Sequence, residues 1–395
     1  NSLDSMKLAG KVLDRAGVKR QMLKPYGKLL NYLQGNPLAI QVILPELAHL
    51  EPEELLIKLQ TGEAEFSEDD KKHGREHSLT ASLSYCLDKL DNLLRSRLGI
   101  LGLFQGFVGV SILSFICDYK EAPELLRGLN QDDWVKMLEQ AVQMGLLQKA
   151  GTDFYRIHPA IPWFFHEILH TVYKKNIRFL EKRFVIGCSQ ISRILQEMIH
   201  SDAEIAMIQL HLEEQNLLYG IRLGVHYRIW DAVNYIFMAM AEMLARESRW
   251  SETELLTVEV ERKATDTKGI SFSGAEVLCA SLWHELGMLA QERRKFTEAE
   301  QYYRKSLAIS EKLKDEDGQA QTLHQLGIIA EDRRKFTEAE QWYRKSLAIK
   351  EKLKDEYGQT TTLHQLGMIA QDRRQFIEAE QWYRKSLAVK EKLKD

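Results

Sequence analysis

The stretch QTLHQLGIIAEDRRKFTEAEQWYRKSLAIKEKLKD, residues 321–355, decides the fold of the C-terminal third, because it occurs nearly unchanged on both sides of itself. Residues 361–395 read TTLHQLGMIAQDRRQFIEAEQWYRKSLAVKEKLKD, and residues 281–315 read SLWHELGMLAQERRKFTEAEQYYRKSLAISEKLKD. The three copies start forty residues apart. Self-similarity at such a fixed period indicates a stack of small supersecondary units.

Each copy is expected to form two amphipathic helices joined at the RRKF segment. Apolar residues before and after this segment recur every three or four positions, which is the spacing of a helical face. In residues 321–355 they are Leu323, Leu326, Ala330, Ala339, Tyr343 and Leu347. Gly327 lies within the first face and would let another helix approach closely. Gly318 and Gly358 are predicted to break the chain between copies, and the Lys/Glu/Arg-rich remainder is predicted to be solvated.

The repeat resembles the tetratricopeptide repeat, a two-helix unit that stacks into an α-solenoid. In the first copy the resemblance is carried by Trp283, Leu286, Gly287, Ala299 and Tyr303. Later copies depart from it, with leucine at the tryptophan position. The forty-residue period is longer than usual and is similar to that of kinesin light chains and many bacterial signalling proteins. HEAT-type repeats share the period but not the pattern of small residues.

Stacking of such units leaves a concave groove, and in this family the exposed side of each first helix lines it. The resemblance therefore implies a groove for a protein or peptide ligand, lined by His284, Met288, Gln291, His324, Ile328, Glu331, His364, Met368 and Gln371. A histidine at every fortieth position also invites a metal interpretation. Stacked copies would place these histidines on separate repeats, so groove-lining or hydrogen-bonded structural histidines are preferred.

Composition divides the chain into five segments. Residues 1–61 are predicted to be a helical subdomain, 62–77 a charged linker, 78–173 a winged-helix domain, 174–270 a helical arm of degenerate repeat-like units, and 271–395 the repeat array. The winged helix is expected because helices give way to QMGLLQKAGTDFYRIHP, where a glycine turns between two short extended stretches. The predicted fold class is therefore all-α with one small β-hairpin, ending in an α-solenoid.

The segment before the repeats also resembles the C-terminal half of the NB-ARC module of STAND signalling ATPases. The order of motifs carries the resemblance: GNPLAI at 35–40, then LTASLSYCLDKLDNLLRSRLGILGLFQG, then FYRIHP at 154–159. In that family a Gly-x-Pro proline packs against adenine, which corresponds here to Pro37. A winged-helix histidine contacts the β-phosphate of ADP in the closed state, which corresponds to His158. Many members have Met-His-Asp where this chain has Ile-His-Pro, so the locking role of the aspartate is in doubt.

No phosphate-binding loop of the form G-x-x-x-x-G-K-[ST] occurs in the chain. Without that loop, backbone amides cannot cradle phosphates and no hydroxyl is placed for magnesium. No Gly-x-Ser-x-Gly motif occurs, and no carboxylate pair stands out from solvated surface. We therefore expect no enzymatic activity, catalytic residue, metal or cofactor in this chain. The family resemblance implies that ADP or ATP binds to the full-length protein.

Charge and cysteine content favour a cytoplasmic protein. The net charge of -3 provides no general attraction to nucleic acid or to an anionic membrane. Cys86, Cys117, Cys188 and Cys279 fit neither a zinc pattern nor a disulfide framework, and they are predicted to be reduced and mostly buried.

The uncharged segment 99–117 is long enough to cross a bilayer, but GLFQGFVG within it predicts a turn between two short buried helices instead.

Three functions are compatible with these patterns. The preferred one is the ligand-sensing and regulatory part of a STAND-type signal-transduction protein, whose winged helix relays binding to an absent nucleotide-binding core. The second is a repeat adaptor scaffold without a switch, which would not need Pro37 or His158. The third is a winged-helix transcription regulator. Against it, the helix that would enter the DNA groove, in NQDDWVKMLEQAVQMGLLQK, begins with two aspartates that phosphates repel.

Two further expectations concern assembly. The STAND resemblance implies homo-oligomer formation on activation. The third regular copy is not followed by the divergent polar unit that normally closes a repeat array, so the natural protein is expected to continue with further repeats.

Overall fold

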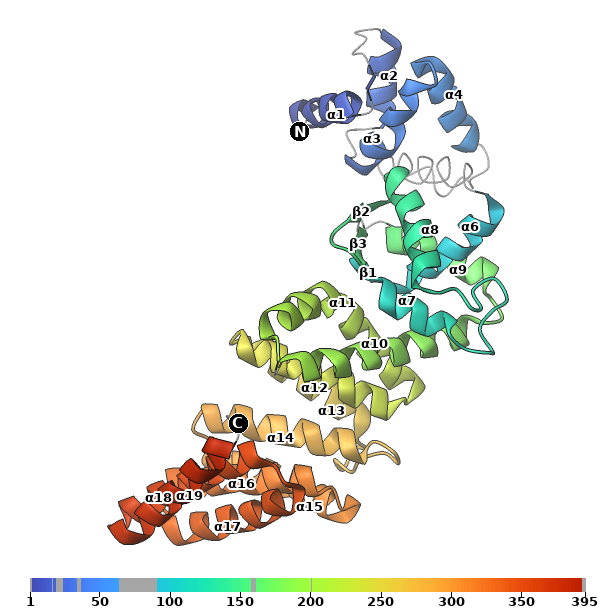
Figure 1. The fold of residues 1–395 in the computed structure, drawn as a ribbon. Coiled ribbons are helices and arrows are strands. Elements are labelled where there is room, and N and C mark those ends of the chain that lie inside the picture. Colours follow the sequence, from blue (N-terminus) through green and yellow to red (C-terminus); the bar gives the residue numbers. More distant parts are fainter. Residues whose placement is uncertain are drawn as a thin grey trace. The chain divides into compact units, whose positions relative to one another are not determined.

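The computed structural model describes residues 2–15, 17–18, 24–33, 37–63, 91–157, 161–199 and 201–392. Helices make up most of it, with one small sheet, and it divides into two compact units, residues 1–223 and 224–395 (Figure 1). The predicted fold class, all-α with a small β-element, is confirmed.

The first unit begins with a group of short helices. They are α1 (Ser2–Arg15), α2 (Lys24–Tyr32), α3 (Pro37–Ile43), the 3-10 helix η1 (Leu44–Ala48) and α4 (Pro52–Glu63). Leu29, Leu33, Ile40 and Leu55 are fully or almost fully buried, so aliphatic side chains form the core of this group. The predicted linker begins within the last turn of α4, and its residues from 64 onward lie outside the described part.

Residues 91–172 hold the sheet of the first unit. The elements are α6 (Asn92–Leu98), η3 (Gly99–Leu103), β1 (Phe107–Gly109), α7 (Val110–Cys117), α8 (Gln131–Gln143), β2 (Leu147–Lys149), β3 (Phe154–Ile157) and α9 (Ile161–Val172). The strands are antiparallel in the order β1-β3-β2, with Val108 opposite Tyr155 and Gln148 opposite Arg156. The predicted hairpin through Gly151 is thus present as β2 and β3.

The third strand corrects the sequence-based prediction. Residues 107–109 were assigned to a turn, but they pair with β3 as an edge strand. The reason is that buried backbone groups need partners, and the free edge of a two-stranded hairpin supplies them. Around this strand, η3 and α7 are buried, so segment 99–117 is a protein core as expected. Among the described residues, no helix is long and apolar enough to cross a membrane.

Two long helices complete the first unit, and shorter pairs follow. They are α10 (Ile177–Ile199) and α11 (Ala203–Tyr227), then α12 (Trp230–Arg246) and α13 (Trp250–Ala264). Cys117, Cys188 and Cys279 are free and buried, as predicted, whereas Cys86 lies outside the described residues. Burial raises the pKa of the Cys117 and Cys279 thiols to about 12, so both stay protonated at neutral pH.

The second unit ends in three helix pairs, one for each sequence copy. The pairs are α14 (Glu276–Glu292) with α15 (Phe296–Leu313), α16 (Glu316–Asp332) with α17 (Phe336–Leu353), and α18 (Glu356–Asp372) with α19 (Phe376–Lys392). The second helices α15 and α17 also pack against the first helix of the following copy. The predicted two-helix unit is confirmed in all three copies.

The turns of the array use left-handed residues other than glycine. Within copies these are Arg294, Arg334 and Arg374, and between copies they are Lys314 and Lys354, all with φ of 56–59°. Gly318 and Gly358, predicted as the breaks, lie instead in the first turns of α16 and α18. That prediction was wrong because Asp315 and Asp355 cap these helices, and a Cβ on Gly318 would lie 2.2 Å from Asp315 Oδ2.

The core of the array lies between copies as well as within them. Ala339 and Tyr343 of α17 are fully buried in one cluster with Leu363, Leu366 and Ile369 of α18. Within the second copy, a Cβ on Gly327 would lie 2.5 Å from the ring of Tyr343, so this contact requires glycine. A single pair could not bury both of its faces, which explains the stacking.

The outer face of α19 shows what a copy looks like without a following neighbour. Leu387 is 56% exposed, whereas the equivalent Leu307 and Leu347 are 8% and 7% exposed. Phe376 at the start of α19 is 65% exposed. No further helix pair covers this face in the described part of the chain.

Candidate functional site

The nine predicted groove residues lie on the first helices of the copies, α14, α16 and α18. In the first two copies all six side chains are half-buried, and in the third copy His364, Met368 and Gln371 are exposed. The gradient follows the stacking, because the first two copies are each followed by another copy. Each first helix therefore carries the same row of three side chains: a histidine, an apolar residue, and a residue with an amide or carboxyl group.

The histidines of the first two copies connect neighbouring copies. His284 Nδ1 lies 3.3 Å from Thr322 Oγ1 of the next copy, and His324 Nδ1 lies 3.2 Å from Thr362 Oγ1. The Thr362 hydroxyl donates its hydrogen bond to the carbonyl of Gly358, so its oxygen accepts a hydrogen bond from the Nδ1–H of His324. These two histidines thus match the structural alternative considered from the sequence. His364 has no such bond because no copy follows it in the described residues.

The last residue of each row is held by a tyrosine of the same copy. Tyr303 Oη donates to Gln291 Oε1 at 3.0 Å, Tyr343 Oη to Glu331 Oε2 at 2.8 Å, and Tyr383 Oη to Gln371 Oε1 at 3.0 Å. Burial raises the pKa of Glu331 above the usual range for a carboxyl group. In the first two copies, two of the three positions in a row therefore make hydrogen bonds, and the apolar side chains between them, Met288 and Ile328, pack against the buried clusters.

The pH dependence of stability should report on His284 and His324. Burial lowers the pKa of His284 and His324 to about 4. Above pH 7 both are neutral in the folded and unfolded states. As the pH falls from 6.5 to 4 the unfolded state binds protons first, so the free energy of unfolding should fall by roughly 2–5 kcal/mol in total. Urea titrations at several pH values measure this loss.

The matched control for this prediction lies in the third copy. His324→Phe keeps a ring against Tyr343 but cannot titrate, so its acid-induced loss should be about half as large. His364→Phe makes the same replacement at an exposed histidine and controls for the effect of the substitution itself. Identical slopes in all three proteins would contradict the role assigned to His324.

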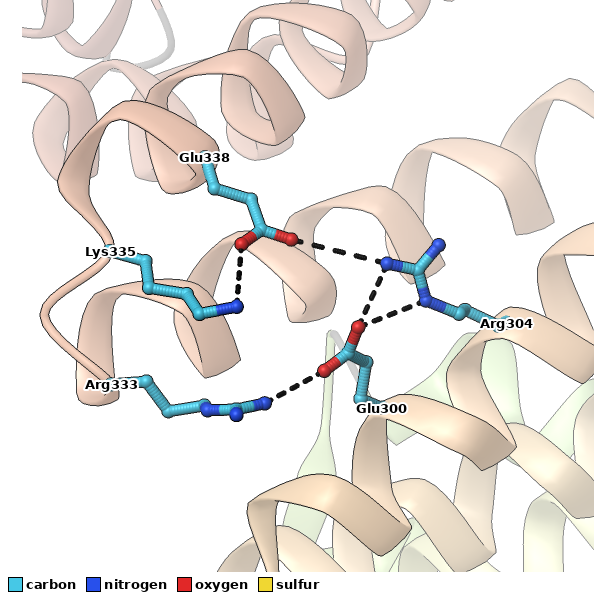
Figure 2. Close-up of polar contacts among 5 residues, drawn as sticks. All are labelled: Glu300, Arg304, Arg333, Lys335 and Glu338. Carbon is cyan, nitrogen blue, oxygen red and sulfur yellow. Dashed lines mark hydrogen bonds and ion pairs between the residues drawn. The ribbon is translucent and has the colours of Figure 1, made fainter.

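An ion-pair network joins the second helices across copies. Figure 2 shows Glu300 of α15 between Arg304 of its own helix, at 2.8 Å, and Arg333 of the next copy, at 2.9 Å. Lys335 holds Glu338 at 3.0 Å, and Arg304 reaches Glu338 at 4.0 Å. Carboxylates and guanidinium groups are thus paired in both directions between neighbouring copies.

The same arrangement recurs at each junction of the second unit. Arg293 pairs with Glu254 at 2.6 Å, Arg373 with Glu340 at 2.6 Å, and Arg344 with Glu378 at 3.2 Å. Exposed pairs contribute only about 0–1 kcal/mol each. These pairs instead fix the register between neighbouring copies, because a shift of one copy along the next would break every pair at that junction at once.

Lys350 departs from the predicted solvated surface. Its side chain is buried, and Nζ donates to Thr362 Oγ1 at 3.0 Å and to the Gly358 carbonyl at 3.4 Å. Burial lowers the pKa of Lys350, although the charges of Asp355 and Asp317 oppose the shift. The sequence prediction failed here because the partners belong to the following copy.

The two nucleotide-contacting positions inferred from family resemblance cannot be brought together from the described residues. Pro37 begins α3, but its side chain and the whole of His158 lie outside the described part. Their roles remain predictions.

Sequence reasoning missed a buried polar cluster in the first unit. Asn216 of α11 accepts from the Gln105 amide at 2.7 Å and donates to the Phe107 carbonyl at 2.8 Å. It also donates to Glu213 at 2.5 Å, and burial raises the pKa of Glu213 to about 7. The available signal was the occurrence of polar residues at helical spacing among the leucines of HLEEQNLL, and α11 uses them to hold the start of β1.

Sequence reasoning also missed one motif. Residues 166–170 on α9 read His-Glu-Ile-Leu-His, which fits the His-Glu-x-x-His pattern of metal-binding helices. His166 and His170 are exposed. Among the described residues, no three His, Cys, Asp or Glu side chains come together as a metal site.

Comparison with known proteins bears on the array. Family models for the tetratricopeptide repeat match residues 278–352 and 360–393. No curated protein sequence matches the chain. Among solved structures, BtubC (BKLC) from P. vanneervenii is 17% identical, with a TM-score of 0.38, over 54% of this chain and 92% of that chain.

A second solved structure is a Signal Transduction ATPase with Numerous Domains (STAND) protein with a tetratricopeptide repeat sensor, from Pyrococcus horikoshii. It is 16% identical, with a TM-score of 0.43, over 98% of this chain, which spans 54% of the length of that protein. The family models identify the repeats themselves. Residues 278–352 and 360–393 of this chain are tetratricopeptide repeats.

Proposed function

We propose that the repeat array docks a protein or peptide and that the chain is the sensing and regulatory part of a cytoplasmic STAND-type signalling protein. The observation that supports docking is the row of first-helix side chains repeated in register on α14, α16 and α18. The STAND assignment rests on the order of the GNPLAI and RIHP motifs before the array. In this proposal the winged helix relays ligand binding to a nucleotide-binding core outside this chain.

The first helices indicate which ligand chemistry fits. Met288, Ile328 and Met368 occupy the apolar position of each row. One helical turn later, each first helix carries an exposed carboxylate: Glu292, Asp332 and Asp372. Each copy therefore offers one apolar and one acidic contact, and the matching ligand is an extended segment with alternating apolar and basic residues.

Charge reversal tests this proposal. Fluorescence anisotropy with labelled Leu/Lys and Leu/Glu peptides of equal length should show tighter binding of the basic peptides. Asp332→Lys together with Asp372→Lys should weaken that binding by at least about tenfold, since like charges across an interface cost several kcal/mol. The control is Glu351→Lys, which reverses an exposed charge on the second helix α17. Equal losses in both variants, or no preference for basic peptides, would remove the groove assignment.

DNA binding separates the relay from the transcription-regulator alternative. Helix α8 begins at an Asn130–Asp133 capping box, so Asp132 and Asp133 both occupy its first turn. A groove-reading helix with two carboxylates at that end is repelled by phosphates. We expect no salt-dependent binding of duplex DNA in a low-salt gel-shift titration, and tight salt-sensitive binding would favour the alternative. An adaptor without a switch differs in a further way, since changes at Pro37 and His158 would then leave nucleotide binding by the full-length protein unaffected.

A further inference from the structure

The exposed face of α9 brings two imidazoles together. The Nε2 atoms of His166 and His170 lie 2.9 Å apart, with ring centroids separated by 4.1 Å. Two neutral imidazoles share only one proton between these nitrogens, so the other nitrogen presents a lone pair. When the shared proton moves to Nδ1 of its own ring, both Nε2 atoms present lone pairs, and one metal ion can be bound by the two of them. We propose that His166 and His170 form a binding site for a divalent transition-metal ion.

The distance between the nitrogens indicates which ions fit. Two ligands at about 2.0 Å from one metal and 90° apart lie about 2.8 Å from each other, whereas a tetrahedral angle separates them by about 3.3 Å. The observed 2.9 Å is closer to the 90° arrangement. Imidazole pairs with 90° angles suit Cu²⁺ and Ni²⁺, and Zn²⁺ would require a small rotation of the rings.

The helix holds the two histidines at this spacing before any metal binds. On the opposite face, Phe165 and Leu169 are fully buried. The packing against η3 is close, because a Cβ on Gly102 would lie 2.5 Å from the backbone nitrogen of His166, and a Cβ on Gly99 would lie 2.9 Å from the Ile168 side chain. The backbone under the pair is therefore fixed, and binding needs only small side-chain adjustments.

The surroundings distinguish this site from a metalloprotease centre. In those enzymes the His-Glu-x-x-His helix supplies two ligands and a general base, and a third protein side chain completes the site. No third ligand joins His166 and His170 among the described residues. Water would fill the remaining coordination positions, so the site binds an exchangeable ion and we assign no catalytic role to Glu167.

Calorimetric titration of the 395-residue chain with CuCl₂ and NiCl₂ tests the site, with Cu²⁺ electron paramagnetic resonance to count bound nitrogens. Loss of an outer hydrogen-bond partner alone weakens metal binding about 10- to 100-fold. His166→Gln and His170→Gln each remove a ligand, so each should weaken the tightest site by at least that much. Both side chains are exposed, and unchanged circular dichroism will show that the variants are folded.

Two controls make the result decisive. His226→Gln removes an exposed helical histidine that has Arg222, and no histidine, one turn before it in α11, so binding should be unchanged. Glu167→Gln should also leave the affinity unchanged. Equal affinity of the chain and His170→Gln, or a loss in only one of the two histidine variants, would overturn the proposed pair.

Discussion

Ala339→Arg should unfold the repeat array at temperatures where the unchanged chain is folded. Ala339 is fully buried in the cluster between the second and third copies. An arginine there must either bury a guanidinium group without a partner or force the two copies apart. We expect a loss of at least about 4 kcal/mol, which belongs to the exceptional range for a single substitution. Circular dichroism melts measure it directly.

One control variant and one further destabilising variant test this prediction. Gln341→Arg introduces the same side chain at an exposed position of the same helix, and its melting should be unchanged. Gly327→Trp should destabilise the array by a different route, because a Cβ alone would lie 2.5 Å from the Tyr343 ring. Unchanged melting of both Ala339→Arg and Gly327→Trp would refute the assigned helix faces.

Asn216→Leu should have the second-largest effect, and in the first unit. Leucine has nearly the same size but leaves the Gln105 amide and the Phe107 carbonyl without their side-chain partner. Each unsatisfied buried polar group costs about 1–3 kcal/mol, so we expect a loss of roughly 2–5 kcal/mol in the free energy of unfolding. Hydrogen exchange at Gln105 should quicken, because its amide would become unbonded.

The comparison for this variant is Gln215→Leu, which changes an exposed neighbour on the same helix. It should leave both stability and exchange at Gln105 unchanged. Similar effects of the two substitutions would mean that Asn216 acts only through the helix and not through its bonds to residues 105 and 107.

The sequence predicts the helices of the array well because the information is local and repeated three times. Apolar spacing within one helix identified Ala339 and Tyr343 as core residues, and both are buried. The turn between copies was misplaced because Lys314 adopts a left-handed conformation for which glycine is the usual signal. Gly318 has a different function, which is to leave room for the cap formed by Asp315.

Contacts between residues far apart in the sequence could not be predicted from local sequence patterns. His284 pairs with a threonine 38 residues away, and Asn216 bonds to residues more than 100 positions earlier. A histidine or asparagine on a helix face has the same pattern whether it meets solvent or a partner from another element. The buried state of Lys350 shows this most clearly, because the adjacent Glu351 in the same charged run is exposed.

The uncovered face of α19 has a consequence for how the array comes apart. Apart from the contacts inside it, each copy packs only against its neighbours, so among the described copies the one with a single neighbour should have the smallest free energy of opening. Leu387 and Phe376 lose little when α18 and α19 separate from α17, because water already reaches them. Opening should therefore start at α19 and proceed toward α14, one copy at a time. When α18 and α19 separate from α17, they expose the face of α17 that they covered, and another helix could pack there.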